Sequence, residues 1–292
     1  MSRGCDEEGM ILVNVLMFVA IAAGLVLLMI NREELALDRG LRTREAARAL
    51  AIVRGGELSA LVALRRDAEQ SPEVDHVGEP WAKLSENGAP IEGGTFDLAI
   101  ADAEGRFNIN SVRTGEVAST VLFQAIGNDA GMTGEQIVAA IEYVRLRGPV
   151  TDLRPLRMAG VEPKVADRLE RLVTALPGRT TLNLNAADEG MLALLFRDPV
   201  VAQRLVAIRA RQGYLTAKDL ADQNVSLPWG TTFRSNTFWV RTRATIGGTS
   251  QQAATLIQRR RAPDGAVDVF PVERWRNAAV PPGAPVLPAA KS

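Results

Sequence analysis

The chain has 292 residues, 47% of them apolar and 23% charged, which is enough apolar sequence for one large folded domain or two modest ones. Its 34 basic and 34 acidic residues balance, so the overall charge favours neither nucleic acid nor an acidic substrate as a partner. One cysteine (Cys5) excludes an internal disulfide, and one histidine (His76) nearly excludes a Cys/His metal site or a Ser-His-Asp triad. We therefore expect a protein that is not an enzyme, with His76 in a loop.

Residues 10–30 form a run of 21 residues without a charge, which as a helix spans roughly 30 Å, the thickness of one hydrocarbon core. A secretory signal peptide would have a shorter apolar region, a basic start and a small-residue cleavage site after it. Two interpretations are left, an ordinary signal anchor and a prepilin-type anchor. The second is favoured because residues 1–9 are polar and end in Gly9, directly before Met10 and the apolar run. We expect cleavage between Gly9 and Met10, with residues 1–9 as the leader and 10–30 as a transmembrane helix.

Residues 31–70 continue the apolar pattern at three- and four-residue steps, with arginine and glutamate on the other face. This spacing predicts an amphipathic helix that is continuous with the membrane span and ends near Pro72. The alternative is a membrane anchor followed by an unrelated helix.

The rest of the chain changes its period twice. Residues 71–110 are predicted to hold a loop and two short strands, at 96–101 and 106–110, joined by a turn. Residues 111–235 are predicted to be helical, with helices at 117–126, 135–147, 153–158, 164–176, 187–196, 200–211 and 217–223. Strands return within residues 236–277, at 238–246, 253–259 and 267–270, and the Pro/Ala-rich residues 278–292 are predicted to be disordered. Strands split by helices indicate an α+β domain with an inserted all-helical subdomain.

Three polar motifs mark the places where the predicted elements change type. The first contains Asp102, Gly105, Asn108 and Asn110, the second contains Asn183 and Asn185, and the third begins at Ser235. Asparagine side chains at such junctions bond free backbone N–H groups and hold a turn. We therefore interpret the four asparagines as structural residues.

These segments, in this order, resemble the K-type minor pseudopilins of bacterial type II secretion. The resemblance begins with the cleavage site at Gly9 and includes the Asp-x-x-Gly-Arg-Phe-Asn-x-Asn turn from Asp102 and the Asn-x-Asn-x-Ala segment from Asn183. It ends with the Ser-x-x-Phe segment from Ser235, and so spans nearly the whole chain. The resemblance implies a pilin-like α+β fold, in which a long N-terminal helix lies on an antiparallel sheet that carries a large inserted helical subdomain.

The resemblance also implies a function without a cofactor. Such a protein caps a pseudopilus together with I- and J-type minor pseudopilins and other type II secretion components, after a prepilin peptidase has removed the leader. It crosses the lipid of the bacterial inner membrane once, with its C-terminal domain in the periplasm. Asn14 stands where most pilins have a glutamate, and K-type pseudopilins characteristically lack that glutamate. A subunit without this charge need not dock beneath another subunit, which suits the first position at a tip.

The alternative function is that of a membrane-anchored periplasmic DNA-uptake protein, because residues 182–223 also resemble a helix-hairpin-helix module. Such modules face a phosphate with the backbone N–H groups of a Gly-apolar-Gly turn at a helix N-terminus. Residues 158–172 are a fainter second copy, whose turn at 160–162 lacks the second glycine, and the turn at 196–199 has no glycine. Residues 111–235 are almost charge-balanced. We therefore expect no nucleic-acid partner and instead a surface for protein contacts.

Calcium is a further property of the K type, which usually binds it in an Asp-rich loop after the helix matching residues 135–147. Here Arg145 and Arg147 stand near the positions of the family's carboxylates, and only Glu142 and Asp152 are close by. Calcium takes about six to eight oxygen ligands, several of them from carboxylates. We therefore expect no tight calcium site in this loop.

Overall fold

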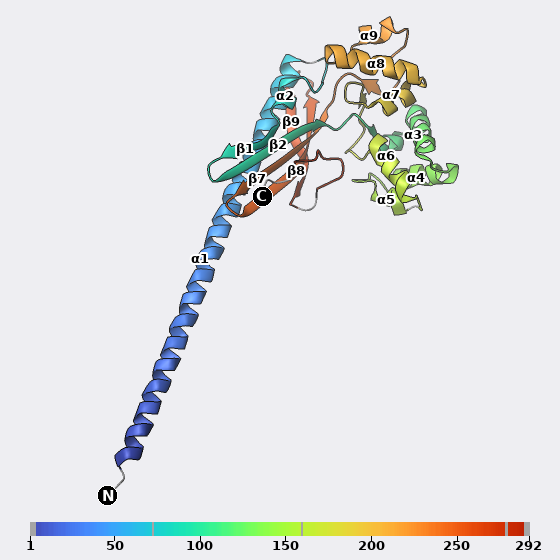
Figure 1. The fold of residues 1–292 in the computed structure, drawn as a ribbon. Coiled ribbons are helices and arrows are strands. Elements are labelled where there is room, and N and C mark those ends of the chain that lie inside the picture. The colour runs from blue at the N-terminus through green and yellow to red at the C-terminus, as the bar shows by residue number, and fades with distance from the viewer. Residues whose placement is uncertain (1–3, 72, 159, 278–279, 289–292) are drawn as a thin grey trace.

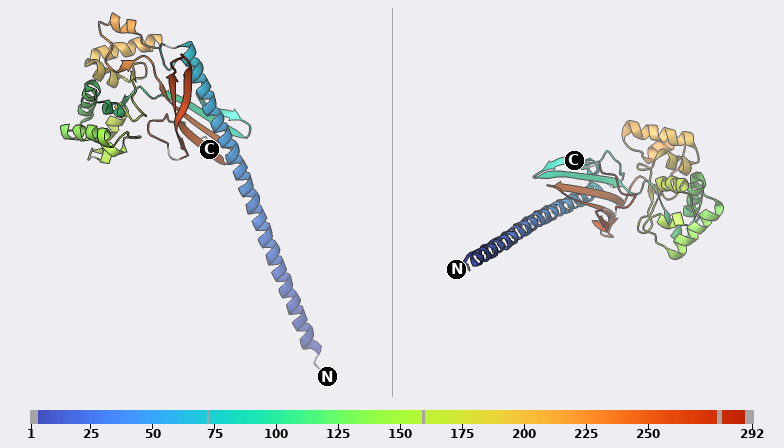
Figure 2. Two further views of the ribbon diagram at one scale, coloured as in Figure 1. Left: turned by 180° about the vertical axis from the view of Figure 1, so that it is seen from behind. Right: turned by 60° about the horizontal axis from the view of Figure 1, so that its bottom comes forward.

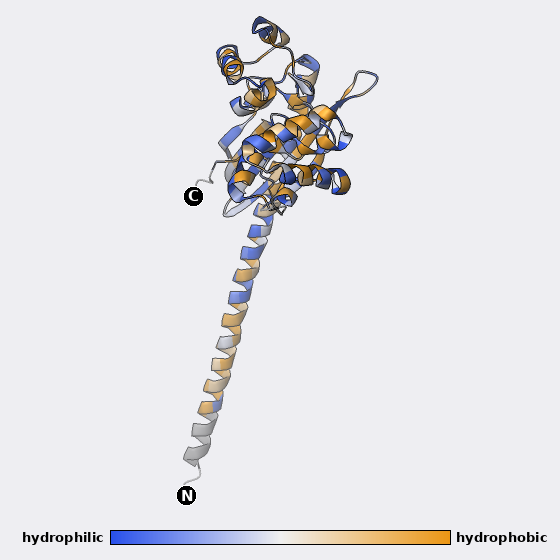
Figure 3. Ribbon diagram, turned by 90° about the vertical axis from the view of Figure 1, so that its right-hand side faces the viewer, coloured by the Kyte–Doolittle hydropathy of each residue, from blue (hydrophilic) through white to orange (hydrophobic). Residues whose placement is uncertain are grey.

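The computed structural model describes residues 4–71, 73–158, 160–277 and 280–288. Helix α1 (Gly4–Gln70) is unbroken and leaves the body of the molecule as a long stem (Figure 1). Over residues 12–44 the stem is exposed, and among the described residues it is the one helix long and apolar enough to cross a membrane. Figure 3 shows apolar residues in the lower stem giving way to alternating polar and apolar residues toward the body.

The second half of α1 covers one face of a five-stranded antiparallel sheet with the strand order β1-β2-β7-β8-β9. The strands are β1 (Glu86–Ile91), β2 (Gly94–Asp102), β7 (Thr237–Ile246), β8 (Thr249–Arg261) and β9 (Val267–Arg276). The helix buries small and branched residues at steps of mostly four against this sheet, none of them more than 3% exposed: Ala49, Val53, Ala60, Leu64 and Ala68. At Gly56 a Cβ atom would lie 2.7 Å from the Phe96 ring, so the close approach of helix and sheet requires glycine there.

The helical subdomain is inserted between two strands that are neighbours in the sheet. The chain leaves at the end of β2 and returns at the start of β7, where Asp102 pairs with Phe238. Between them lie η1 (Ile109–Thr114), α3 (Val117–Ala130), α4 (Gly134–Arg147), α5 (Arg154–Met158), α6 (Pro163–Leu172), α7 (Glu189–Phe196), α8 (Pro199–Gln212) and α9 (Ala217–Asp222). These helices share a core of their own and stand beside the sheet (Figure 2). The long helix, the antiparallel sheet and the helical insertion confirm the predicted α+β fold class.

Two local expectations were wrong. Residues 71–94 were expected to form a loop, but they contain the short helix α2 (Pro80–Lys83) and the strand β1, which pairs with β2 across a turn at residues 92–93. Residues 106–110 do not form a hairpin with β2: β3 (Phe107–Asn108) pairs in parallel with β4 (Val173–Thr174) inside the helical subdomain. The turn after β2 redirects the chain, because the N–H of Ala103 still bonds to β7 while Glu104 N–H bonds back to the Asp102 side chain. A similar parallel pair joins β5 (Leu182–Asn183) to β6 (Thr231–Thr232).

The described part of the C-terminal tail, residues 280–288, packs on the sheet face opposite α1, which contradicts the expected disorder for these residues. Ala284 joins Trp239 and Leu256 in a small core on that face. Arginines then hold the backbone of the tail: Arg106 donates to the Gly283 carbonyl (3.3 Å), Arg241 to Pro285 (3.0 Å) and Arg243 to Pro288 (2.6 Å). A proline residue has no backbone N–H to donate, but its carbonyl remains a good acceptor. Arginine side chains can therefore hold a Pro-rich segment through its carbonyls, although the segment does not join the sheet as a strand.

Neighbouring residues of the tail allow a direct test of this packing. Leu287 is 7% exposed and Val286 is 87% exposed. We expect Leu287→Ala to lower the free energy of unfolding by about 2 kcal/mol, because it removes buried apolar atoms, and Val286→Ala to change it by less than about 0.5 kcal/mol. Urea unfolding of the detergent-solubilised full chain measures both values. Equal, near-zero effects would mean that the tail does not pack on the sheet in solution.

Candidate functional site at the junction of sheet and helical subdomain

The three polar motifs lie together where the sheet meets the helical subdomain. Asp102, the last residue of β2, accepts hydrogen bonds from Asn183 Nδ2 (2.8 Å) and Ser235 Oγ (2.5 Å). The N–H of Asn183 donates to the Glu104 carbonyl at 2.9 Å. At Gly105 a Cβ atom would lie 2.4 Å from the Ala186 carbonyl oxygen, so the two motif turns touch backbone to backbone. Segments about eighty residues apart in the chain therefore form one junction.

Each Asn-x-Asn segment begins with an asparagine that closes its own turn. Asn108 Oδ1 accepts from the N–H of Asn110 (3.1 Å), and Asn183 Oδ1 accepts from the N–H of Asn185 (2.9 Å). The side-chain amide of the same residue then reaches a distant segment, Gly178 from Asn108 and the Asp75 carbonyl from Asn183. Each first asparagine thus fixes a turn and anchors it.

The second asparagine of each segment pairs with both backbone groups of one distant residue. Asn110 donates to the Val150 carbonyl (2.8 Å) and accepts from its N–H (2.9 Å). Asn185 pairs in the same way with Leu215, at 3.2 Å and 2.6 Å. The amide side chain imitates a strand neighbour, and all four asparagines are at most 5% exposed. These contacts support the proposal that the asparagines are structural residues.

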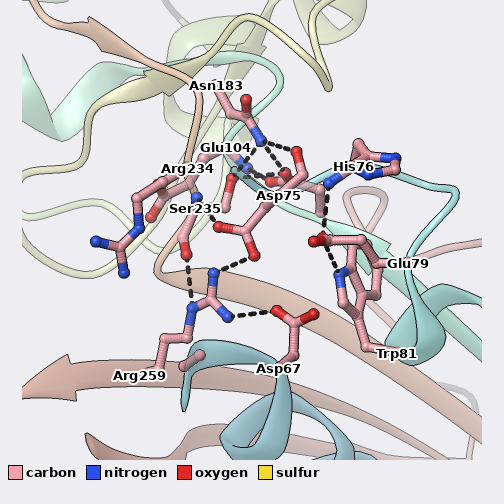
Figure 4. Close-up of polar contacts among 12 residues, drawn as sticks. Asp67, Asp75, His76, Glu79, Trp81, Glu104, Asn183, Arg234, Ser235 and Arg259 are labelled. Atoms are coloured by element: carbon pink, nitrogen blue, oxygen red, sulfur yellow. Dashed lines mark hydrogen bonds and ion pairs between the residues drawn. The ribbon is translucent and has the colours of Figure 1, made fainter. Parts of the chain in front are cut away.

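A buried arginine beside the junction was not singled out from the sequence (Figure 4). Arg259 of β8 donates to Asp67 Oδ2 (3.0 Å), to Asp75 Oδ1 and to the Ser235 carbonyl (2.8 Å), and its guanidinium lies 4.8 Å from the Phe238 ring centre. It joins the end of α1, the loop after α1, the start of β7 and β8. One sequence feature could have indicated this role. Arg259 lies two residues after Ile257, so this charged residue is on the buried face of β8.

Several carboxyl groups lie near this arginine, and burial raises the pKa of three of them. Burial and the nearby Glu79 raise the pKa of Asp67 to about 7. Burial raises the pKa of Asp102 to about 6 and that of Glu104 to about 8. Asp67, Asp75 and Glu79 bring carboxylate oxygens within 4.8 Å of one another, and Arg259 supplies the positive charge beside two of them. The junction is thus a proton-sensitive ion-pair cluster.

Acidic residues stand at the N-cap positions of two helices in the helix-hairpin-helix-like regions. Asp198 Oδ1 accepts from the N–H of Val200 at the start of α8 (2.8 Å), and Glu162 stands at the N-cap position of α6. The Asp198 carboxylate on the N–H groups of α8 takes the place that a phosphate would need and repels it, whereas the Glu162 side chain makes no cap hydrogen bond. The start of α8 is thus capped from within the chain.

The residues around the loop after α4, where no tight calcium site is expected, have protein partners. Arg145 of α4 donates to the Val112 carbonyl (3.0 Å) and to Thr120 Oγ1 (2.9 Å). Asp152 is paired with Arg154. Arg145 therefore links α4 to η1 and α3.

The N-terminal residues lie on the stem, far from the junction. Gly9 and Met10 lie within α1, and Asn14 is an exposed residue of the same helix. They belong to the apolar end of the molecule and are not brought near the junction (Figure 1). The structure therefore separates an anchoring end from a folded end.

The comparisons with known proteins agree along the length of the chain. The sequence is 28% identical to the type II secretion system protein K of Pseudomonas aeruginosa, over 92% of this chain and 93% of that protein. It is 24% identical to the type II secretion system protein K of Klebsiella pneumoniae, over 89% of this chain and 95% of that protein. The sequence is therefore similar to type II secretion system K proteins over nearly its whole length. No family model matches it.

A solved structure of a K-type complex shares the fold. The chain superposes with a TM-score of 0.61 on a chain of the GspK-GspI-GspJ complex of the enterotoxigenic Escherichia coli type 2 secretion system, at 18% identity. The match covers 82% of this chain and 100% of that chain. The match shows that the two chains share their fold, a long helix on an antiparallel sheet with a helical insertion.

Proposed function

We propose that this chain caps the periplasmic tip of a type II secretion pseudopilus, assembled with I- and J-type minor pseudopilins and without catalytic activity. The observation that carries the proposal is the uncovered stem of α1. Leu35, Leu37 and Leu41 are 54%, 68% and 56% exposed, although they lie between the apolar span and the sheet. Leu37 and Leu41 are four residues apart and lie on one face of the helix, and apolar residues exposed outside the membrane need neighbouring helices to cover them. The full-length likeness to K proteins, and a solved complex that contains I and J partners, support helices of those two types.

The two ends of the chain fit this role. We propose that a prepilin peptidase cuts between Gly9 and Met10, and that residues 10–30 then stay in the lipid of the inner membrane with the rest in the periplasm. Asn14 carries no charge to pair with the terminal amine of a neighbouring subunit. The helical subdomain stands toward the end of the molecule away from this anchor (Figure 1), which leaves it free for contacts at a tip.

A charge placed on the stem should break the assembly. We expect the wild-type full chain to co-purify in detergent with the I- and J-type pseudopilins of its own secretion system, and Leu37→Glu to reduce their recovery at least about tenfold, because a carboxylate in a helix–helix interface is desolvated without a partner. The matched control is Leu146→Glu in α4, which is 81% exposed and distant from the stem. Absence of a complex with the wild-type chain, or equal recovery with both variants, would contradict the proposal.

A further inference from the structure

A cavity of about 560 Å³ opens where the helical subdomain meets the end of β8. Its lining includes five arginines: Arg179, Arg234, Arg259, Arg260 and Arg261. Glu104 is the single carboxyl among the described residues that line it. Ala68 of α1 also lines the cavity, which places it at the end of the molecule opposite the apolar span (Figure 1).

Two of these arginines are already neutralised by carboxylates of this chain. Arg259 is paired with Asp67 and Asp75 inside the junction. Arg179 lies 2.8 Å from Glu116. Neither is available to an incoming anion without breaking an existing pair.

The other three arginines carry charge that the chain does not balance closely. Arg261 donates to backbone carbonyls only, and Arg260 lies 3.9 Å from Asp268 with both side chains mostly exposed. Within the described residues, the Nε–H of Arg234 is buried without a hydrogen-bond partner. Figure 4 shows its guanidinium turned away from the Arg259 cluster. A buried donor without an acceptor is unfavourable, so the Arg234 guanidinium, which lines the cavity, has unused hydrogen-bonding capacity.

The one carboxyl in the lining does not cancel this charge. Burial raises the pKa of Glu104 to about 8, so the group is mostly neutral at pH 7. A neutral carboxyl also offers an O–H donor rather than a repelling charge. The cavity is therefore a positively charged pocket at neutral pH.

We propose that this pocket binds the carboxylate of an acidic segment of a partner protein, with Arg234 and Arg260 as the contacting cations. Guanidinium groups match carboxylates in a planar, two-bond geometry. Phe270 lies under Arg260, 5.6 Å from its guanidinium, and supplies the aromatic surface typical of protein interfaces. Lipid headgroups are excluded as the source because the pocket lies at the far end of the molecule. The inference goes beyond the capping role and does not require it.

The test uses the full chain in detergent and a fluorescein-labelled acetyl-Glu-Glu-Glu peptide at low salt, with acetyl-Gln-Gln-Gln as the uncharged comparison. We expect the glutamate peptide to bind and the glutamine peptide not to bind. Arg234→Gln and Arg260→Gln should each weaken binding about tenfold, as one lost charge-assisted contact does. Arg204→Gln, an exposed arginine of α8 outside the pocket, should leave binding unchanged. Thermal melts verify that each variant is folded.

The possible outcomes decide between sources of the anion. Inorganic phosphate is titrated in parallel and as a competitor. Phosphate binding without peptide binding would show a small-anion site and overturn the proposal. So would absence of glutamate-peptide binding to the wild-type chain, equal binding of both peptides, or a loss with Arg204→Gln as large as the loss with Arg234→Gln. Arg260 is exposed, so its variant keeps the test informative if Arg234→Gln does not fold.

Discussion

Arg259→Ala is expected to lower the free energy of unfolding by about 3–5 kcal/mol, because it leaves two buried carboxylates without their cation. The side chains of Arg259, Asp67 and Asp75 are at most 3% exposed, so water cannot replace the lost contacts. The carbonyl of Ser235 loses its donor as well. Urea unfolding of the full chain in detergent, followed by tryptophan fluorescence, measures the loss.

The neighbouring arginine provides the control for this variant. Arg260→Ala removes the same side chain one residue later, where it is 72% exposed and 3.9 Å from Asp268, and should cost less than about 1 kcal/mol. Adding Asp75→Asn to Arg259→Ala should restore part of the stability, because it removes one of the unpaired charges. If Arg259→Ala were as mild as Arg260→Ala, the buried cluster would not hold the sheet, α1 and the loop after α1 together.

The second expected result is a protein that is more stable in mild acid than at pH 8. Burial raises the pKa of Glu104 from 4.5 to about 8, so the folded chain keeps a proton there that the unfolded chain loses near pH 4.5. The stability is complete below pH 4.5 and falls as the pH rises through the folded-state pKa, by about 1.4 kcal/mol per pH unit from this group. Asp67 and Asp102, whose pKa values burial also raises, act in the same direction up to about pH 7 and pH 6.

A neutral isostere should remove the contribution of Glu104. We expect Glu104→Gln to be more stable than the wild-type chain at pH 8 and similar to it at pH 5, which flattens the dependence of the melting temperature on pH. The matched control is Glu142→Gln, at an exposed position of α4, which should leave the profile unchanged. A wild-type melting temperature that rises from pH 5 to pH 8, or a Glu104→Gln profile parallel to the wild type, would contradict this assignment.

Patterns that are local in the chain allowed much of the fold to be predicted. The apolar run at residues 10–30 and the periodic residues after it indicated one long helix, because helical burial repeats every three or four residues. The change of period at residues 111–235 indicated a helical insertion between strands. Asn108, Asn110, Asn183 and Asn185 were predicted as turn residues, because a side chain that bonds the backbone two positions later acts within its own segment.

Only the tertiary structure decided which distant segments meet. Arg259 lies 192 residues from Asp67 and 184 from Asp75, and no sequence spacing connects them. The Pro/Ala-rich tail had the composition of a disordered segment, yet residues 280–288 are held by arginines of β7 that point away from α1. The sequence alone determined most of the elements and their order, since propensity and periodicity act over a few residues. Pairing of buried charges and the docking of the tail depend on the assembled sheet, which brings residues together regardless of their distance in the chain.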